Sequence, residues 1–157
     1  MGPNTNKDTR VALDAVRRIV QTLHESSKSA ERHVGVSGAQ LFVLQRLAES
    51  PAASLNDLAA RTHTHQSSAS VVVTRLVGRG LVKRAHGSHD GRRKELSLTA
   101  AGRRLVERAP DAVQDRLIAA VEALPKKKRA VLAVALAELA QAVAGARRAQ
   151  MFFEDER

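Results

Sequence analysis

The sequence predicts a mainly α-helical chain with a small β wing. Three observations predict this fold class. Apolar residues recur at helical spacing over most of the 157 positions. A short helix, a three-residue polar break and a second helix are expected in succession near the middle of the chain. After Gly80 the apolar period shortens to the alternation that is typical of strands. With 43% hydrophobic residues, such a chain can bury a core as one domain or as two small ones.

The first expected helix starts at Asp8, after a tail of residues 1–7 that contains glycine, proline and two asparagines. The helical pattern continues for about twenty residues, and we expect it to end in the polar stretch 25–28. Four apolar residues recur at helical spacing: Val11, Ala15, Ile19 and Leu23.

A second helix is expected directly after Ser37. Ser37 and Gln40 have the spacing of a capping box, in which each side chain accepts a hydrogen bond from the backbone of the other residue. Pro51 and its small neighbours are expected to stop this helix. Its apolar face is formed by Leu41, Leu44, Leu47 and Ala48.

The next two helices have the proportions of a helix-turn-helix. Ser54 and Asp57 repeat the cap spacing in front of a short helix, and residues 62–64 form a polar break. The following helix is expected from His65 or Gln66 to Val77, closed by the glycines after it. Its inward residues are Ala69, Val72, Val73 and Leu76.

Two short extended runs follow, at residues 81–85 and 94–98. The connector between them, residues 86–93, is basic and rich in turn-forming residues, which indicates a hairpin with an exposed tip. A hairpin attached to the preceding helix pair makes a winged helix-turn-helix.

The remaining chain is expected to be helical. Thr99 is the expected N-cap of a fifth helix to about Leu124, which Pro110 should kink or divide. Pro125 fits the first position of a sixth helix to about Ala146. Because eight of the seventeen residues 130–146 are alanine and most others are apolar, this helix has several apolar faces, and a partner subunit is the economical cover for them.

The net charge of +10 is concentrated in one part of the chain. Residues 61–108 carry 11 basic and 3 acidic groups, a net +8. A concentrated basic block favours a polyanionic partner, and nucleic acid fits better than an anionic membrane because the block lacks one long amphipathic helix. The chain has no cysteine, no apolar run near the length of a membrane span and no leader pattern at its start, so we expect a cytoplasmic protein that has no membrane partner.

The string Asp90-Gly91-Arg92-Arg93-Lys94-Glu95-Leu96-Ser97-Leu98-Thr99, followed by Gly102, resembles the wing signature of the multiple-antibiotic-resistance regulator (MarR) family. The stretch from Leu58 to Leu76, continued by Gly80-Leu81-Val82, resembles the helix-turn-helix of that family. The order of elements is similar over about residues 8–146. The sequence departs at Gly78-Arg79-Gly80, where the family often has a charged helical end, so a looser junction to the wing is expected.

This resemblance implies a homodimeric, DNA-binding transcription factor, usually a repressor. Its dimerisation domain would comprise residues 8–36 and 100–146, and its winged helix-turn-helix DNA-binding domain residues 37–99. Residues 147–157 would form a C-terminal tail. Independently of the resemblance, two of the three aromatic residues of the chain lie in this tail beside acidic residues, and we expect Phe152 and Phe153 to dock on the dimerisation domain or on a partner subunit. The operator would be a pseudo-palindrome, and a small-molecule effector, whose binding residues are unknown, could release it.

The resemblance also implies that Arg92 reaches the minor groove and that Asp90 holds it in place. Independently, the focused negative potential of a narrow minor groove favours arginine. Polar residues at the start of the second helix of the pair can meet base edges or phosphates. The complete set of expected DNA-contacting residues is Gln66, Ser67, Ser68, Ser70, Thr74, Arg75, Lys83, Arg84, Asp90, Arg92 and Arg93.

Other functions are weighed against this prediction. A non-specific architectural nucleic-acid-binding protein would use the same basic block. An enzyme is not expected, because the sequence has no nucleophile elbow, phosphate loop or helical metal-binding pair. His86 and His89 have chelating spacing, but no third ligand is fixed by the sequence, so neither metal nor cofactor is expected.

Overall fold

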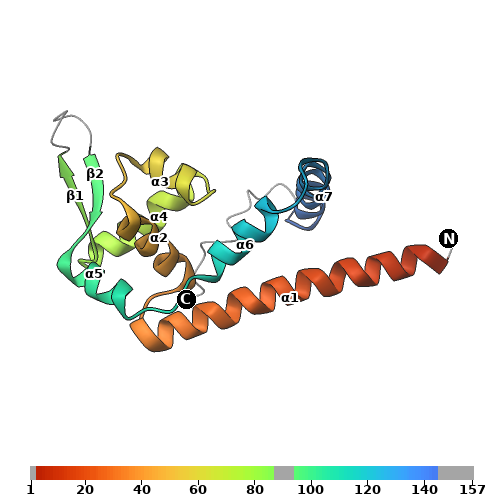
Figure 1. Ribbon diagram of the computed structural model, residues 1–157, viewed down its shortest axis with the longest axis horizontal. Helices are drawn as coiled ribbons and strands as arrows, with labels where there is room; N and C mark the ends of the chain where they lie inside the picture. Colours follow the sequence, from red (N-terminus) through yellow and green to blue (C-terminus); the bar gives the residue numbers. More distant parts are fainter. Residues whose placement is uncertain (1–2, 87–93, 145–157) are drawn as a thin grey trace.

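The computed structural model describes residues 3–86 and 94–144 of the chain (Figure 1). Within these ranges the fold is mainly helical with one small antiparallel sheet, as predicted. The elements are α1 (Pro3–Val34), α2 (Gly38–Glu49), α3 (Leu55–Arg61), α4 (Gln66–Gly78), β1 (Val82–His86), β2 (Lys94–Leu98), α5 (Ala100–Glu107), α6 (Val113–Glu122) and α7 (Lys126–Ala144). The expected tail 147–157, with Phe152 and Phe153, lies outside the described residues.

Helix α1 is longer at both ends than predicted. It begins at Pro3, so most of the expected N-terminal tail is helical, and it continues through the polar stretch 25–28 to Val34. Gly35 follows the last residue of the helix and stops it. It has a φ of 69° and donates a backbone hydrogen bond to Glu31 O at 2.9 Å. The predicted end at residues 25–28 was wrong because polar side chains do not stop a helix whose surface is largely exposed, whereas a left-handed glycine does.

The core is built around α2, which lies at the centre of the lobe formed by α2–α5 and the sheet (Figure 1). Ser37 and Gln40 form the predicted capping box at the start of α2. Leu41, Leu44 and Leu47 are buried as predicted, whereas Ala48 is exposed because it lies at the edge of the apolar face. The core also receives side chains from the other elements of the lobe, among them Leu58, Val73, Leu76, Leu96 and Leu98.

Proline 110 divides the expected fifth helix into α5 and α6. Arg108 N and Ala109 N donate to Leu105 O and Val106 O, which closes α5, and α6 begins after Ala112. The expected sixth helix is α7, and its first turn includes a hydrogen bond from Arg129 N to Pro125 O at 3.0 Å. The break at Pro110 therefore separates the lobe from the segment α6–α7.

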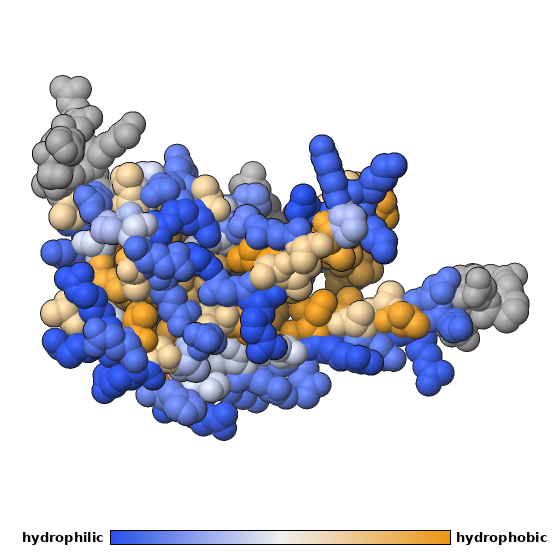
Figure 2. Space-filling model, in the orientation of Figure 1, coloured by the Kyte–Doolittle hydropathy of each residue, from blue (hydrophilic) through white to orange (hydrophobic). Residues whose placement is uncertain are grey.

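Helices α1, α6 and α7 extend to one side of the lobe (Figure 1). Figure 2 shows apolar side chains at the surface along α1 and α7. Nine exposed large hydrophobic residues lie on these two helices: Val11, Leu13, Ile19, Val20, Val131, Val134, Leu136, Leu139 and Val143. We call these nine residues the apolar arm surface.

Candidate nucleic-acid interface

The turn between α3 and α4 is held by its own backbone and by Thr62. Thr64 N and His63 N donate to Ala59 O and Ala60 O, which closes α3 in a Schellman motif. His63 has a φ of 53°, a left-handed conformation in which histidine is more common than most residues. The buried Thr62 hydroxyl donates to Leu58 O at 2.9 Å and lies 2.9 Å from the Thr64 hydroxyl. These bonds fix the angle at which α4 leaves α3.

Helix α3 is tied to the end of α2 by Arg61. The Arg61 guanidinium donates to the carbonyl of Arg46 in the last turn of α2 and to those of Ser50 and Pro51, directly after that helix. At the other end of α3, the Ser54 side chain accepts from Asp57 N at 3.1 Å, as the cap spacing predicted. The position of the turn is thus set by α2.

Helix α4 presents one buried and one outward face. Ala69, Val72, Val73 and Leu76 are buried, as predicted. Gln66, Ser67, Thr74 and Arg75 are exposed, whereas Ser68 and Ser70 are partly buried at the edges of the outward face. The helix contains no acidic residue, so nothing on its outward face repels a phosphate backbone.

Val71 was missed by the sequence analysis. It is 43% exposed and lies between Ser67 and Thr74 on the outward face of α4, at i+4 from the serine and i−3 from the threonine. An exposed valine at this place can contact the methyl group of thymine in the major groove. The helical period from Ser67 would have identified it, but the expected DNA-contacting residues of this helix were chosen for their polar or charged side chains, and valine has neither.

The junction between α4 and the wing is closed rather than loose. Gly80, with a φ of 67°, donates from its backbone to Val77 O at 2.9 Å, and Leu81 N donates to Leu76 O at 3.0 Å. This Schellman motif ends α4. Arg79 also donates to Gln40 Oε1 at 3.2 Å, which ties the end of α4 to the start of α2. The expected looseness is therefore wrong, since a left-handed glycine fixes the chain direction here.

The wing strands are antiparallel, with Val82 opposite Leu98 and Arg84 opposite Leu96. Ala52 extends the sheet by two backbone hydrogen bonds with Leu96, at 2.8 and 2.9 Å. On β1, Lys83 and Arg84 are both exposed, as a role in DNA contact requires. Of the other expected contacts, Asp90, Arg92 and Arg93 lie in the segment 87–93, outside the described residues.

The winged helix-turn-helix geometry agrees with comparisons with known proteins. The sequence profile of the MarR family matches residues 34–93. The HTH-type transcriptional regulator FarR of Neisseria gonorrhoeae is 35% identical over 106 residues, which are 68% of this chain and 73% of that protein. The chain belongs to the MarR family. It is a DNA-binding transcriptional regulator and not an enzyme.

Two further relatives are also named as transcriptional regulators. The HTH-type transcriptional repressor MdtR of Bacillus subtilis is 33% identical over 95 residues, which are 60% of this chain and 59% of that protein. The crystal structure of a probable transcriptional regulator from Pseudomonas aeruginosa is 28% identical, with a TM-score of 0.52 over 80% of this chain and 97% of the other. Among the described helices of this MarR protein, none is long and apolar enough to cross a membrane.

A small cavity of about 120 Å³ lies between the helix-turn-helix and α6. Its floor is apolar, and Gln114 Oε1 is a buried acceptor without a hydrogen-bond partner among the described residues. At its rim, His63 Nε2 lies 3.8 Å from Glu122 Oε1, an ion pair only when the imidazole is protonated. The cavity is lined by Ala39, Phe42, Thr62, His63, Thr64, Gln114, Leu117 and Ile118. In the described ranges, no group of three histidine or acidic side chains could hold a metal ion.

Proposed function

We propose that this MarR regulator is a homodimer that binds a pseudo-palindromic operator through two copies of α4. The observation that carries the proposal is the outward face of α4, which presents polar side chains together with Val71 and contains no acidic residue, beside the exposed basic side chains of β1. A single α4 reads only a few base pairs, so two copies one helical turn apart would be needed for specificity. Gln66, Ser67, Ser68, Ser70, Thr74 and Arg75 would contact the major groove, and Lys83, Arg84 and Arg93 the phosphates.

Dimerisation is supported by the surface of α7. This helix has nineteen residues, and none of those whose burial is described is buried. Val131 and Val143 are 70% and 80% exposed. A contiguous surface of this kind is unfavourable in water and is typical of a subunit interface. Residues 8–36 and 100–146 would form the dimerisation domain, and residues 37–99 the DNA-binding domain.

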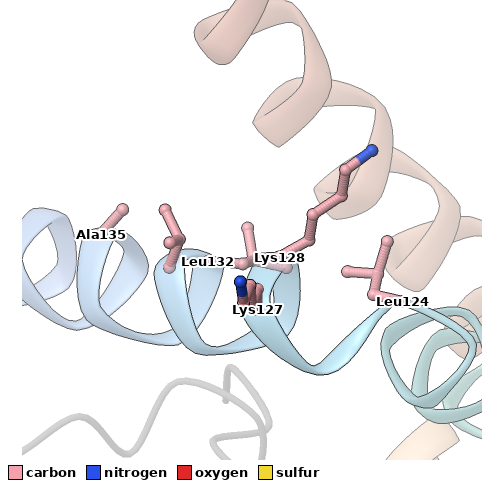
Figure 3. A pocket seen from close by; sticks show the side chains of 6 residues that line it. Leu124, Lys127, Lys128, Leu132 and Ala135 are labelled. Atoms are coloured by element: carbon pink, nitrogen blue, oxygen red, sulfur yellow. The ribbon is translucent and has the colours of Figure 1, made fainter.

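An open groove on α7 supports the same interface. It has a volume of about 510 Å³, and Figure 3 shows the side chains of Leu124, Lys128, Leu132 and Ala135 projecting from one side of the helix and of the turn before it. Side chains of a second copy would fill such a groove, and the lysine stem would cover its edge. Lys127 and Val131 complete the lining.

Repression is the proposed mode of action, and the relative MdtR carries the name of a repressor. A bound dimer would occlude a promoter. A small molecule in the cavity between the helix-turn-helix and α6 would release DNA if it favoured a dimer whose two α4 helices no longer match the groove spacing. The unpartnered acceptor of Gln114 would then bind a donor group of that molecule.

The proposal is tested by fluorescence anisotropy with DNA from upstream of the gene itself. Unrelated DNA of equal length is the control, both at about 150 mM salt, where screening weakens non-specific binding. We expect tight binding to the upstream DNA alone, with one dimer per site. Equal binding to both DNAs, combined with failure to enrich any sequence from a random pool, would indicate an architectural protein instead.

Substitution of Arg92 by alanine tests the wing. We expect Arg92→Ala to weaken operator binding by about 1–3 kcal/mol, because a minor-groove contact is lost. Arg103→Ala, which removes an exposed arginine from α5, is the matched control for the change in net charge. Equal affinities of Arg92→Ala and the control at moderate salt would contradict the role assigned to the wing.

Substitution at the start of α4 tests base recognition. We expect Gln66→Ala combined with Ser67→Ala to lower the preference for the operator over unrelated DNA by about 1–3 kcal/mol, while non-specific affinity changes little. Both side chains are exposed, so the fold should tolerate the change. Competition binding measures the ratio of the two affinities. Equal losses on both DNAs would show that these residues contact phosphates only.

A further inference from the structure

The break between α5 and α6 is held by one side chain from α2. Gln45 Nε2 donates to Pro110 O at 2.9 Å, and Gln45 Oε1 accepts from Ala112 N at 3.1 Å. One amide thus satisfies an acceptor and a donor that the interruption of the helix leaves without helical partners. Gln45 is separated from these two residues by 65 and 67 positions in the sequence. The two hydrogen bonds, which we call the Gln45 clamp, therefore form only when the lobe is folded.

The Gln45 clamp is buried on the Ala112 side and is supported by a neighbouring ion pair. Ala112 is 1% exposed, so its N–H is shielded from water and depends on Gln45 for its hydrogen bond. Ala112 is also the N-cap of α6 and has no side chain that could cap the helix itself. One residue further along α2, the Arg46 guanidinium pairs with Asp115 of α6. The same guanidinium lies 2.8 Å from Glu49 Oε1 and is positioned over the Phe42 ring. Two consecutive residues of α2 therefore fix the start of α6.

The same helix carries the position of α4. Leu44 and Leu47 of α2 share one core with Val73 and Leu76 of α4, and Gln40 accepts a hydrogen bond from Arg79 at the end of α4. Helix α2 is accordingly the rigid body between the surface that reads DNA and the segment α6–α7 (Figure 1). An angular change at the Pro110 break would rotate α4 relative to that segment.

We propose that Gln45 is the positioning residue that sets the distance between the two α4 helices of the dimer, and hence the half-site spacing that the protein accepts. The inference rests on the proposed function, since it requires a dimer that reads two half-sites. Gln45 does not touch DNA in this proposal. It acts by holding the break between α5 and α6 in one geometry, so that only one operator spacing matches both copies of α4.

The size of the effect follows from the two hydrogen bonds. One typical hydrogen bond favours the arrangement that it closes by about fivefold, so two favour it by about 25-fold. In Gln45→Ala the favoured geometry loses this advantage. We expect the preference for the native spacing over a spacing one base pair longer to fall by about tenfold or more in the dimer.

The test is selection of binding sites from random-sequence DNA by the full-length protein and by Gln45→Ala. The wild type should select paired half-sites with one centre-to-centre distance, and the variant should select the same half-sites at several distances. Asn56→Ala is the matched control, because it removes an exposed side-chain amide from α3, outside the proposed dimerisation domain and outside the expected set of DNA-contacting residues. Anisotropy on operators with altered spacing then gives the ratio of affinities.

A purely structural role would lower the melting temperature without changing the selected spacing. A folded Gln45→Ala dimer with the wild-type spacing and affinity ratio would therefore overturn the proposal. If Gln45→Ala does not fold, Gln45→Glu decides, because it keeps the acceptor for Ala112 N and replaces the donor to Pro110 O by a carboxylate oxygen, which cannot donate. Wild-type protein that selects single half-sites or no sequence would instead contradict the proposed function, and the role of Gln45 with it.

Discussion

Substitution of Gly102 by alanine is expected to destabilise the protein by about 3 kcal/mol, at the upper end for an overpacked site. A Cβ at this position would lie 2.2 Å from Leu81 O and 3.4 Å from a methyl group of Leu98. The carbonyl cannot move aside easily, because it accepts a hydrogen bond from Thr99 N at 3.0 Å. Gly102 N itself donates to the Thr99 hydroxyl that caps α5. The glycine thus allows α5 to start directly against the base of the wing.

Chemical denaturation measures this effect, and Gly78→Ala is its control. Gly78 is the last residue of α4, and a Cβ there would meet no atom within 4 Å. This second alanine should leave stability unchanged or raise it by up to about 1 kcal/mol, because alanine is the better helix former. If the two variants unfolded at the same denaturant concentration, the close approach of α5 to Leu81 could not be a rigid feature of the fold.

Most of the features that local chemistry determines were predictable from the sequence. Ser37, Ser54 and Thr99 were identified as caps from the sequence, and each accepts the backbone hydrogen bond that its spacing implied. The apolar period placed Val72 and Leu76 in the core. Proline 110 divided a helix because it lacks an N–H and clashes with the preceding turn. These features depend on residues within one or two helical turns of each other.

Other features depend on contacts between distant residues, which no local pattern contains. Gln45 meets the Pro110 break from 65 positions away, and Arg61 reaches back to the end of α2. The bridge between Ala52 and Leu96 adds a partner to the wing sheet from a segment that reads as a loop. The end of α1 was mispredicted for a local reason, because Gly35 was passed over in favour of a polar stretch.

The candidate site was predictable in outline and incomplete in detail. The sequence identified the polar start of α4, and the structure exposes Gln66, Ser67 and Thr74. It did not identify Val71, since only polar and charged residues of this helix were considered for DNA contact and the angular position of the valine was not worked out. Ser67 is exposed and Ser68 is partly buried. This difference depends on how α4 packs in the folded lobe, which the sequence of two adjacent serines does not contain.

Introduction of a charge on the apolar side of α7 is expected to dissociate the proposed dimer. At about 100° of rotation per residue, Leu139 lies near the centre of a stripe that contains Val131, Ala135 and Val143. Its side chain is 43% exposed in the single chain, so aspartate is tolerated there. In a dimer the charge would be buried without a partner in both copies, which costs several kcal/mol per site.

Leu139→Asp should therefore weaken dimerisation by more than about 100-fold, as measured by analytical ultracentrifugation. Operator affinity should fall with it, because each α4 would then bind its half-site alone. Gln141→Asp is the matched control. It adds the same charge to the same helix, about 160° away from Leu139, and leucine and glutamine have similar helix propensities. If Leu139→Asp stays dimeric, the dimer interface does not include this stripe of α7. If both Leu139→Asp and Gln141→Asp are monomeric, the interface also includes the side of α7 that carries Gln141.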